Sequence, residues 1–175
     1  MEMTLKKLDR ASPELPAVLA LYESAFPENE RREPDEIIGG EDGAGELLAV
    51  MRGSELSGML AVLTYRDITH ILYFAVMPEQ RSSGIGAAAL AALRERYPGQ
   101  RIIADLERPE PGTPTREQRL RRLAFYERCG YYPTDVKYRW RGEDYVIVAS
   151  GGAITEKEFG GFWRHFHPER RNEDV

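Results

Sequence analysis

The segment from residue 70 to residue 106 constrains the fold more than any other part of the sequence. Residues 70–76 form an apolar run rich in β-branched and aromatic side chains, which is typical of an interior strand covered on both faces. From Gly84 the sequence is alanine-rich, with apolar residues at helical spacing up to Tyr97. A further strand is predicted over 101–106, so strand, helix and strand follow within about 38 residues. That length suits a crossover, which predicts two parallel strands in one sheet.

Shorter patterns on both sides of this unit predict the other elements. Residues 3–8 predict a first strand, and Ser12 before Pro13 predicts the N-cap of a helix that is closed by Pro27. The remaining expected elements before residue 116 are a short helix over 35–38, a hairpin of strands 46–51 and 56–65, and a loop over 107–115. After it we expect a helix over 116–129 with Leu120, Leu123 and Ala124 inward and Gly130 as its stop, a hairpin of strands 135–140 and 145–149, and a last helix over 155–165 capped by Thr155 and Glu158. The pattern predicts one domain over 1–175, with 151–175 as a peripheral helix and tail.

Composition narrows the classes of function. The 175 residues carry 24 Lys and Arg against 29 Asp and Glu, a formal charge of −5, so a basic nucleic-acid-binding face is not expected. Cys129 is the only cysteine, which fits a reducing compartment, and His165 and His167 lack a third ligand at zinc spacing. No signal-peptide core is present, and no apolar run approaches the ~20 residues of a membrane span. We therefore expect a cytoplasmic protein with no metal, no membrane partner and no nucleic-acid partner.

The junction over 76–87, which reads Val-Met-Pro-Glu-Gln-Arg-Ser-Ser-Gly-Ile-Gly-Ala, is the strongest candidate for a binding site. A helix N-terminus carries unpaired N–H groups and a partial positive charge, and glycine lets an anion approach the backbone. Arg81 adds a guanidinium fork. Neither a P-loop lysine nor the three-glycine dinucleotide fingerprint follows. The residues alone leave two interpretations open: a pyrophosphate-binding loop, or an ordinary strand-to-helix turn in which Gly84 and Gly86 relieve crowding.

Two motifs resemble the GNAT superfamily of N-acyltransferases. Residues 81–86, after a strand that ends in Ala-Val-x-Pro, resemble the Arg/Gln-x-x-Gly-x-Gly/Ala signature of that family. Residues 123–131, reading Leu-Ala-Phe-Tyr-Glu-Arg-Cys-Gly-Tyr, look like its second motif. The two motifs occur in the order and at the separation usual in the family. Residues 116–118 stand where the family often has an asparagine, so one cofactor contact is missing.

The resemblance implies an acyl-CoA N-acyltransferase with acetyl-CoA as co-substrate. It also implies an α/β (α+β) fold, with a mixed, mostly antiparallel sheet of about seven strands flanked by helices. In such a fold the central parallel pair, here 70–76 and 101–107, splays apart to admit the coenzyme. The family's cofactor contacts carry over to the backbone or side chains of Phe74, Ala75, Val76, Arg81, Ser82, Ser83, Gly84, Ile85, Gly86 and Ala87.

Acetyl transfer to an amine requires loss of a proton from the amine, whose pKa is ~10.4 in solution, and benefits from an acid for the departing thiolate. Tyr126 matches the family position of that acid, although a tyrosine here can also simply pack its ring. Glu107 and Asp105 project to one side of their strand by the period-two rule. Either can act as the base or lie at a solvated strand end, and we expect Glu107 to be catalytic and Asp105 to contact the acceptor. Glu30, in a Phe-Pro-x-x-Glu-Arg stretch that resembles some bacterial members, is a rival on the acceptor side.

The sequence therefore predicts transfer of an acetyl group from acetyl-CoA to an amine of a small molecule or peptide, by direct attack in a ternary complex. Two alternatives stay open, namely a non-catalytic acyl-CoA-binding sensor and a transferase for a longer acyl group. A homodimer is also left open. Acceptor specificity is expected from 28–45, 107–115 and the C-terminal segment.

Overall fold

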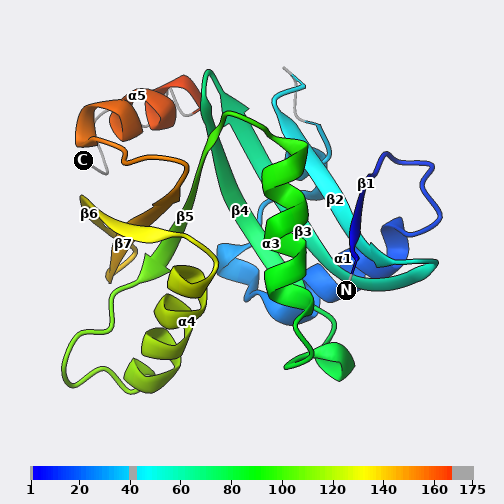
Figure 1. Ribbon diagram of the computed structural model, residues 1–175, viewed down its shortest axis with the longest axis horizontal. Helices are drawn as coiled ribbons and strands as arrows, with labels where there is room; N and C mark the ends of the chain where they lie inside the picture. The colour runs from blue at the N-terminus through cyan, green and yellow to red at the C-terminus, as the bar shows by residue number, and fades with distance from the viewer. Residues whose placement is uncertain (1, 40–42, 167–175) are drawn as a thin grey trace. The chain divides into compact units, whose positions relative to one another are not determined.

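The computed structural model describes residues 2–39 and 43–166, which contain seven β-strands and five α-helices (Figure 1). The strands form one mixed sheet in the order β1-β2-β3-β4-β5-β7-β6, in which β4 and β5 are the parallel pair. The expected fold class is confirmed, while the splay of the parallel pair stays a prediction. The chain divides into two compact units, unit 1 (Met1–Thr64 and His70–Pro98) and unit 2 (Tyr65–Thr69 and Gly99–Val175). The single-domain organisation stays a prediction.

Unit 1 is built on an antiparallel meander. β1 pairs with β2 and β2 pairs with β3, with a bulge at Val50 and Met51 and a tight turn at Gly53, whose φ is +61°. At Gly58 the neighbouring backbone comes very close, because a Cβ there would meet the carbonyl oxygen of Ala75 at 2.5 Å. The strands are β1 (Thr4–Lys7), β2 (Gly45–Arg52), β3 (Glu55–Tyr65) and β4 (Ile68–Val76).

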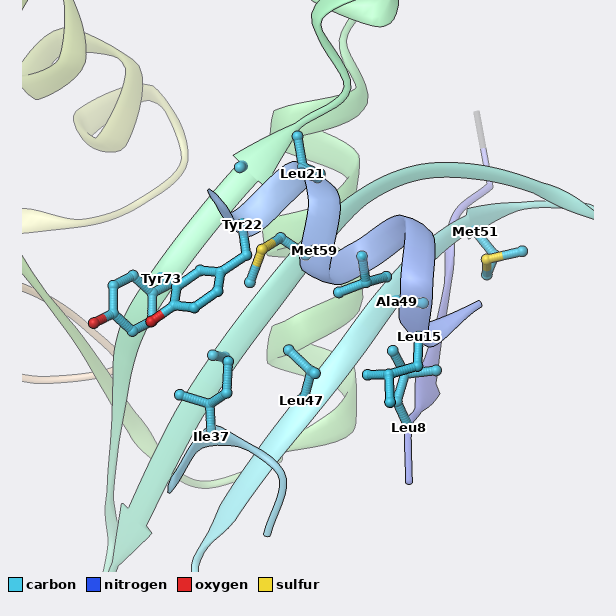
Figure 2. Close-up of a cluster of buried hydrophobic side chains, with 13 residues drawn as sticks. Leu8, Leu15, Leu21, Tyr22, Ile37, Leu47, Ala49, Met51, Met59 and Tyr73 are labelled. Atoms are coloured by element: carbon cyan, nitrogen blue, oxygen red, sulfur yellow. The ribbon is translucent and has the colours of Figure 1, made fainter. Parts of the chain in front are cut away.

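Helices α1 (Leu15–Ala25) and α3 (Ile85–Arg96) cover opposite faces of this meander (Figures 1 and 2). Alternate strand residues face α1, because side chains along a strand point to opposite faces in turn. The cluster on the α1 side also includes Ile37 of the short helix α2 (Pro34–Ile37). Its other members are Leu8, Leu15, Val18, Leu21, Tyr22, Leu47, Ala49, Met51, Met59, Ala61, Tyr73 and Ala75.

The N-terminus of α1 differs from the sequence prediction. The N-cap residue is Glu14, which makes no capping hydrogen bond through its side chain, and the helix begins at Leu15. The hydroxyl oxygen of Ser12 instead accepts a hydrogen bond from the N–H of Asp9 at 2.9 Å. Serine and aspartate can satisfy nearby backbone groups in a turn as well as at a helix start. The predicted N-cap at Ser12 is therefore wrong.

Unit 2 contains an antiparallel group in which β5 pairs with β7 and β7 pairs with β6. Positive φ angles at Arg141 (50°) and Gly142 (80°) give the two-residue turn that suits the twist of a hairpin. Leu120 is 37% exposed, so its predicted inward position is wrong. The elements are β5 (Arg101–Glu107), α4 (Arg116–Arg128), β6 (Tyr132–Trp140), β7 (Glu143–Ser150) and α5 (Glu156–Phe166). No helix in the described part of the chain is long and apolar enough to span a bilayer.

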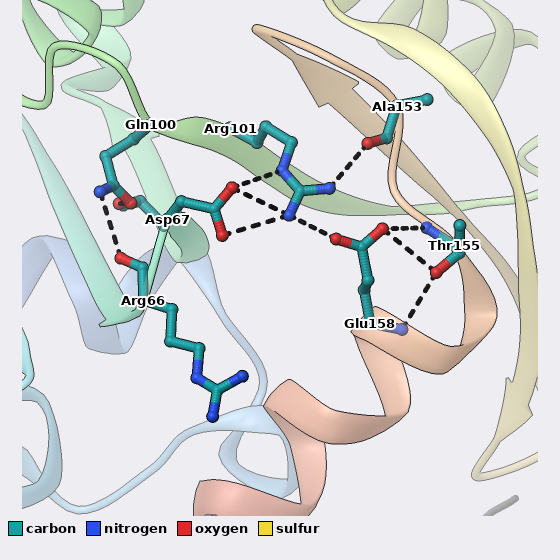
Figure 3. Close-up of polar contacts among 8 residues, drawn as sticks. Arg66, Asp67, Gln100, Arg101, Ala153, Thr155 and Glu158 are labelled. Carbon is teal, nitrogen blue, oxygen red and sulfur yellow. Dashed lines mark hydrogen bonds and ion pairs between the residues drawn. The ribbon is translucent and has the colours of Figure 1, made fainter.

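A polar network fixes the N-terminus of α5 (Figure 3). Thr155 and Glu158 form the predicted capping box: the Thr155 hydroxyl donates to Glu158 Oε1 at 3.1 Å and accepts from the Glu158 N–H at 3.1 Å. Glu158 also pairs with Arg101 at 2.5 Å, and Arg101 pairs with Asp67 at 3.0 Å and donates to the Ala153 carbonyl oxygen. The hydrogen bond from Arg101 and those at Thr155 lower the pKa of Glu158 to about 2.

Replacing Glu158 with glutamine is expected to remove a pH-dependent part of the stability. Because the folded pKa of about 2 lies below the ordinary value of 4.5, the ionised carboxylate stabilises the fold fully above about pH 4.5 and loses this effect as the pH falls toward 2. Thermal unfolding should therefore show a higher Tm for the wild type than for the variant at pH 7, with the difference shrinking between about pH 4.5 and 2. Glu156→Gln, which removes the same charge from the same helical turn, is the control. A wild-type advantage independent of pH would contradict this role.

Candidate functional site

The turn between β4 and α3 presents a series of backbone N–H groups. Ser82 (φ 62°) and Gly84 (φ 84°) both adopt left-handed conformations, and Gly84 is the N-cap of α3. The first α-helical hydrogen bond runs from the N–H of Ala88 to the carbonyl oxygen of Gly84 at 3.1 Å. In the described part of the chain, no protein acceptor is recorded for the N–H groups of residues 82–87. Unpaired amides at a helix N-terminus favour an anionic ligand.

Side chains of the loop itself tie this turn to the neighbouring strands. Gln80 donates from Nε2 to the carbonyl oxygen of Leu56 at 3.0 Å, and the Ser83 hydroxyl donates to the carbonyl oxygen of Gln80. Arg81 donates from Nε to the carbonyl oxygen of Val76 at 3.4 Å. These contacts hold the loop against β3 and the end of β4. Sequence reasoning missed Gln80, because nothing in a local pattern indicates which carbonyl of β3 lies beside it.

The predicted cofactor-binding residues form one continuous path within unit 1. Phe74, Ala75 and Val76 end β4, residues 81–84 form the exposed loop, and residues 85–87 begin α3. A Cβ added at Gly84 would meet no atom of the described protein within 4 Å. Gly84 is thus favoured by its positive φ and not by crowding, while the choice between a pyrophosphate-binding loop and an ordinary turn stays open.

Tyr126 is held by the way α4 ends. Gly130 has a φ of +86°, its N–H donates to the carbonyl oxygen of Glu127 at 3.0 Å, and the N–H of Tyr131 donates to that of Tyr126 at 2.9 Å. These bonds form a Schellman motif, and the expected apolar contact is present because the rings of Tyr126 and Tyr131 meet edge to face at 5.4 Å. The predicted stop at Gly130 is confirmed.

Burial sets the protonation state of Tyr126. The residue is 7% exposed, and burial raises the pKa of its phenol well above the ordinary value of 10.0. The guanidinium of Arg122 lowers that pKa, while Cys129 and the carboxylate of Asp105 raise it. The phenol is therefore neutral at physiological pH and available as a hydrogen-bond donor.

Asp105 lies close enough to Tyr126 to influence its pKa, and it accepts a hydrogen bond from the hydroxyl of Tyr138. Tyr138 is on β6, so its side chain crosses β7 to reach β5. The Tyr138 ring is fixed by stacking on Tyr145 at 5.2 Å and on Phe159 at 5.6 Å. Burial and the charge of Asp105 raise the pKa of Tyr138, so this phenol stays protonated. Sequence reasoning missed Tyr138.

Glu107, at the end of β5, is engaged by an arginine of α4. Arg119, whose side chain is 9% exposed, pairs with Glu107 at 2.7 Å and with Glu143 at 3.2 Å. The guanidinium also donates to the carbonyl oxygen of Arg108 at 3.1 Å. The structure thus gives the two predicted carboxylates of β5 different partners, a phenol for Asp105 and a guanidinium for Glu107. Neither partner carries a sequence motif that could have identified it.

Glu30 ends the 3₁₀ helix Glu28–Glu30 of unit 1, and its side chain is exposed. Its carbonyl oxygen accepts a hydrogen bond from the hydroxyl of Tyr73 at 2.6 Å. The backbone at Glu30 is thereby fixed to β4. The predicted acceptor-side residue and the β4 end of the predicted cofactor path therefore lie in the same unit.

The described residues contain no group of three His, Cys, Asp or Glu side chains placed to hold a metal ion. His165 stacks on Tyr65, with ring centroids 3.9 Å apart. His167 lies outside the described residues. In unit 2 the charge of Asp105 acts on the pKa of Tyr126, while in unit 1 a hydrogen bond joins the loop that begins at Arg81 to Val76.

Comparison with solved structures identifies the fold. An acetyltransferase of the GNAT family from Bacteroides thetaiotaomicron matches with a TM-score of 0.77 at 21% sequence identity, over 93% of this chain and 95% of that chain. A GNAT family acetyltransferase from Elizabethkingia anophelis with acetyl-CoA bound matches with a TM-score of 0.57 at 17% identity, over 85% and 97% of the two chains. The aminoglycoside 6′-N-acetyltransferase from Enterococcus faecium matches with a TM-score of 0.61 at 17% identity, over 83% and 95%.

Comparison at the level of sequence gives a family assignment. A search among curated proteins finds no matching relative. The family model described as acetyltransferase (GNAT) family matches residues 15–131, which is well over half of the 175 residues. The match spans both motifs singled out above, the loop at 81–86 and the helix end at 123–131. This chain belongs to the acetyltransferase (GNAT) family.

Proposed function

We propose that this protein is an N-acetyltransferase that transfers the acetyl group of acetyl-CoA to an amine of a small molecule or peptide by direct attack in a ternary complex. The observation that carries the proposal is the run of N–H groups over 82–87 without a protein acceptor, at the N-terminus of α3. A pyrophosphate is the part of acetyl-CoA that such amides suit. Two similar structures support the proposal, one with acetyl-CoA bound and one an aminoglycoside N-acetyltransferase.

The residues of unit 1 fit the coenzyme in two ways. The amides of 82–87 and the guanidinium of Arg81 supply donors for the two phosphates, and the open space at Gly84 leaves room for them. The backbone of Phe74, Ala75 and Val76 supplies hydrogen-bonding groups along which an extended pantetheine arm can lie. Acetyl-CoA itself supplies the activated thioester, and the protein binds and orients it.

Tyr126 is proposed to stabilise the departing thiolate. A neutral phenol with a raised pKa donates a hydrogen bond and does not release its proton easily. Full proton transfer is not needed, because a thiol has a pKa near ~8.5 and its thiolate is a tolerable leaving group. We therefore assign Tyr126 as a donor to the sulfur, in the position of the general acid.

Glu107 is proposed to take the proton from the amine, and Asp105 to contact the acceptor. Arg119 holds the Glu107 carboxylate against α4, the helix that carries Tyr126. Asp105 is fixed by Tyr138 near the same phenol. Two carboxylates with different partners on one strand are suited to different roles.

These two assignments predict different pH–rate profiles. Glu107→Gln is expected to lower kcat about 100-fold and to flatten the acidic limb of the profile, because the proposed general base is removed. Asp105→Asn is expected to raise the KM of the acceptor and to keep the acidic limb. Glu107→Gln is expected to fold, because Arg119 keeps Glu143 as a partner in this variant. Circular dichroism checks the folding of both variants. The opposite pattern would exchange the two roles.

The function itself is tested in two steps. Thermal unfolding with CoA should show stabilisation by about 2.7 kcal/mol at a hundred times Kd. Release of free CoA from acetyl-CoA should then be followed across a panel of primary amines that includes polyamines, aminoglycosides and peptides. No stabilisation by CoA would contradict the proposal. Stabilisation without turnover would favour a non-catalytic acyl-CoA-binding sensor. Faster turnover with a longer acyl-CoA would favour a transferase for a longer acyl group.

A further inference from the structure

Two tyrosine hydroxyls hold one short stretch of backbone on the acceptor side of unit 1. Tyr73 donates to the carbonyl oxygen of Glu30 at 2.6 Å, and Tyr22 donates to the carbonyl oxygen of Arg32 at 2.9 Å. The N–H of Arg32 donates to both phenol oxygens, at 2.6 Å to Tyr22 and 3.1 Å to Tyr73. Each phenol has one proton, so this arrangement uses each proton once and is self-consistent.

The two rings that carry these hydroxyls are rigidly packed. Tyr22 projects from α1 and Tyr73 from β4, and their rings meet edge to face at 4.8 Å (Figure 2). Phe26 contacts the Tyr73 ring at 4.9 Å. Tyr22 is 2% exposed and Tyr73 is 7% exposed. Burial and the neighbouring Tyr73 phenol raise the pKa of Tyr22, which keeps that phenol protonated.

The segment that they hold has little other regular structure. The 3₁₀ helix ends at Glu30, Arg31 is extended, and helix α2 begins only at Pro34. A connecting segment of this kind is normally the more mobile part of a fold. Here it is tied to Tyr73, directly before the β4 residues Phe74 to Val76 that we propose lie along the thioester arm.

We propose that Tyr22 and Tyr73 are positioning residues that set the register of segment 28–32, and with it the carboxylate of Glu30, relative to β4 and the bound thioester. This inference rests on the proposed function. Segment 28–32 then forms one wall of the acceptor site. The hydroxyls of Tyr22 and Tyr73 hold this wall in place, and no helix or strand does so. Small errors in such placement cost rate, because transfer depends on the approach of nucleophile and thioester.

Tyrosine-to-phenylalanine variants test the inference, since they keep both rings and remove only the hydroxyls. The acceptor is the amine with the highest kcat/KM in the panel described above. Tyr73→Phe is expected to raise the KM of this amine at least tenfold and to leave the KM of acetyl-CoA within twofold. Tyr22→Phe should act in the same direction but less strongly, because Tyr73 alone holds Glu30. Hydrogen exchange in peptides that cover 28–33 should quicken in both variants.

Tyr97→Phe is the matched control. It removes the hydroxyl of a half-buried tyrosine of unit 1, which bonds to Glu46 at the C-terminal end of α3. This variant should leave the KM of the amine and the exchange over 28–33 unchanged. If Tyr73→Phe changes neither KM, or raises both KM values together, the positioning role is overturned. If the wild type is stabilised by CoA but acetylates no amine, the proposed function fails, and the positioning role fails with it.

Discussion

Replacing Tyr126 with phenylalanine is expected to lower kcat about 100-fold, which is the low end of the range for a single proton donor. The low end applies because, in the role that we propose, the phenol only donates a hydrogen bond to a thiolate that can leave without full protonation. The ring stays in place against Tyr131, so CoA should still stabilise the variant. The measurement is steady-state release of CoA at saturating acetyl-CoA and amine, with the stabilisation by CoA measured on the same samples.

Tyr131→Phe is the control for Tyr126→Phe. It removes only the hydroxyl from the fully buried ring that packs on Tyr126, and we assign Tyr131 no role in the reaction. Its kcat should remain within a few-fold of the wild type. Full activity in Tyr126→Phe would reduce this tyrosine to a packing residue. Equal losses in both variants would indicate that the end of α4, and not the hydroxyl of Tyr126, limits the rate.

Replacing Gly84 with alanine is expected to raise the Kd for CoA at least tenfold. A residue with a Cβ in the left-handed conformation costs about 1–2 kcal/mol, so the backbone at the helix start resists the shape it has with glycine. The added methyl group meets no described protein atom within 4 Å, so any steric conflict that it causes is expected with the bound phosphates and not with the protein. Isothermal titration with CoA measures the change.

Gly99→Ala provides the comparison, because Gly99 follows the other end of α3. Its φ is +77°, close to the +84° of Gly84, and a Cβ there also meets nothing within 4 Å. Both variants should lose similar stability, but only Gly84→Ala should lose affinity for CoA. Equal Kd values in the two variants would mean that the loop at 82–87 does not bind the coenzyme.

Local sequence signals predicted the elements whose ends depend on a few neighbouring residues. The capping box of Thr155 and Glu158 and the Schellman end at Gly130 are examples, because each is satisfied within one turn of helix. The N-cap at Ser12 was wrong because Asp9 offered a competing turn at equally short range. Leu120 was wrong because helical spacing gives a stripe but does not say how much of it the fold covers.

The candidate site also contains residues that a local motif could identify and residues that only the fold brings together. The cofactor path from Phe74 to Ala87 is one stretch of sequence, so a motif could identify it. The partners of the two carboxylates could not be predicted, because Tyr138 reaches Asp105 only through the strand order β5-β7-β6. Arg119 meets Glu107 because α4 packs against β5, and this packing depends on contacts between residues distant in the sequence.

The Schellman motif at the end of α4 gives Tyr126 a structural role besides its proposed catalytic one, so a substitution at this position affects both. Its hydroxyl has the catalytic role that we propose, and its ring is the apolar contact on which the chain turns toward β6. A lineage that abandoned the chemistry would still need a large flat side chain at this position, with a matching one at Tyr131. Among divergent relatives of this protein, any aromatic residue at position 126 would therefore indicate the structural role. Only a tyrosine, with its hydroxyl, would indicate the proposed catalytic role.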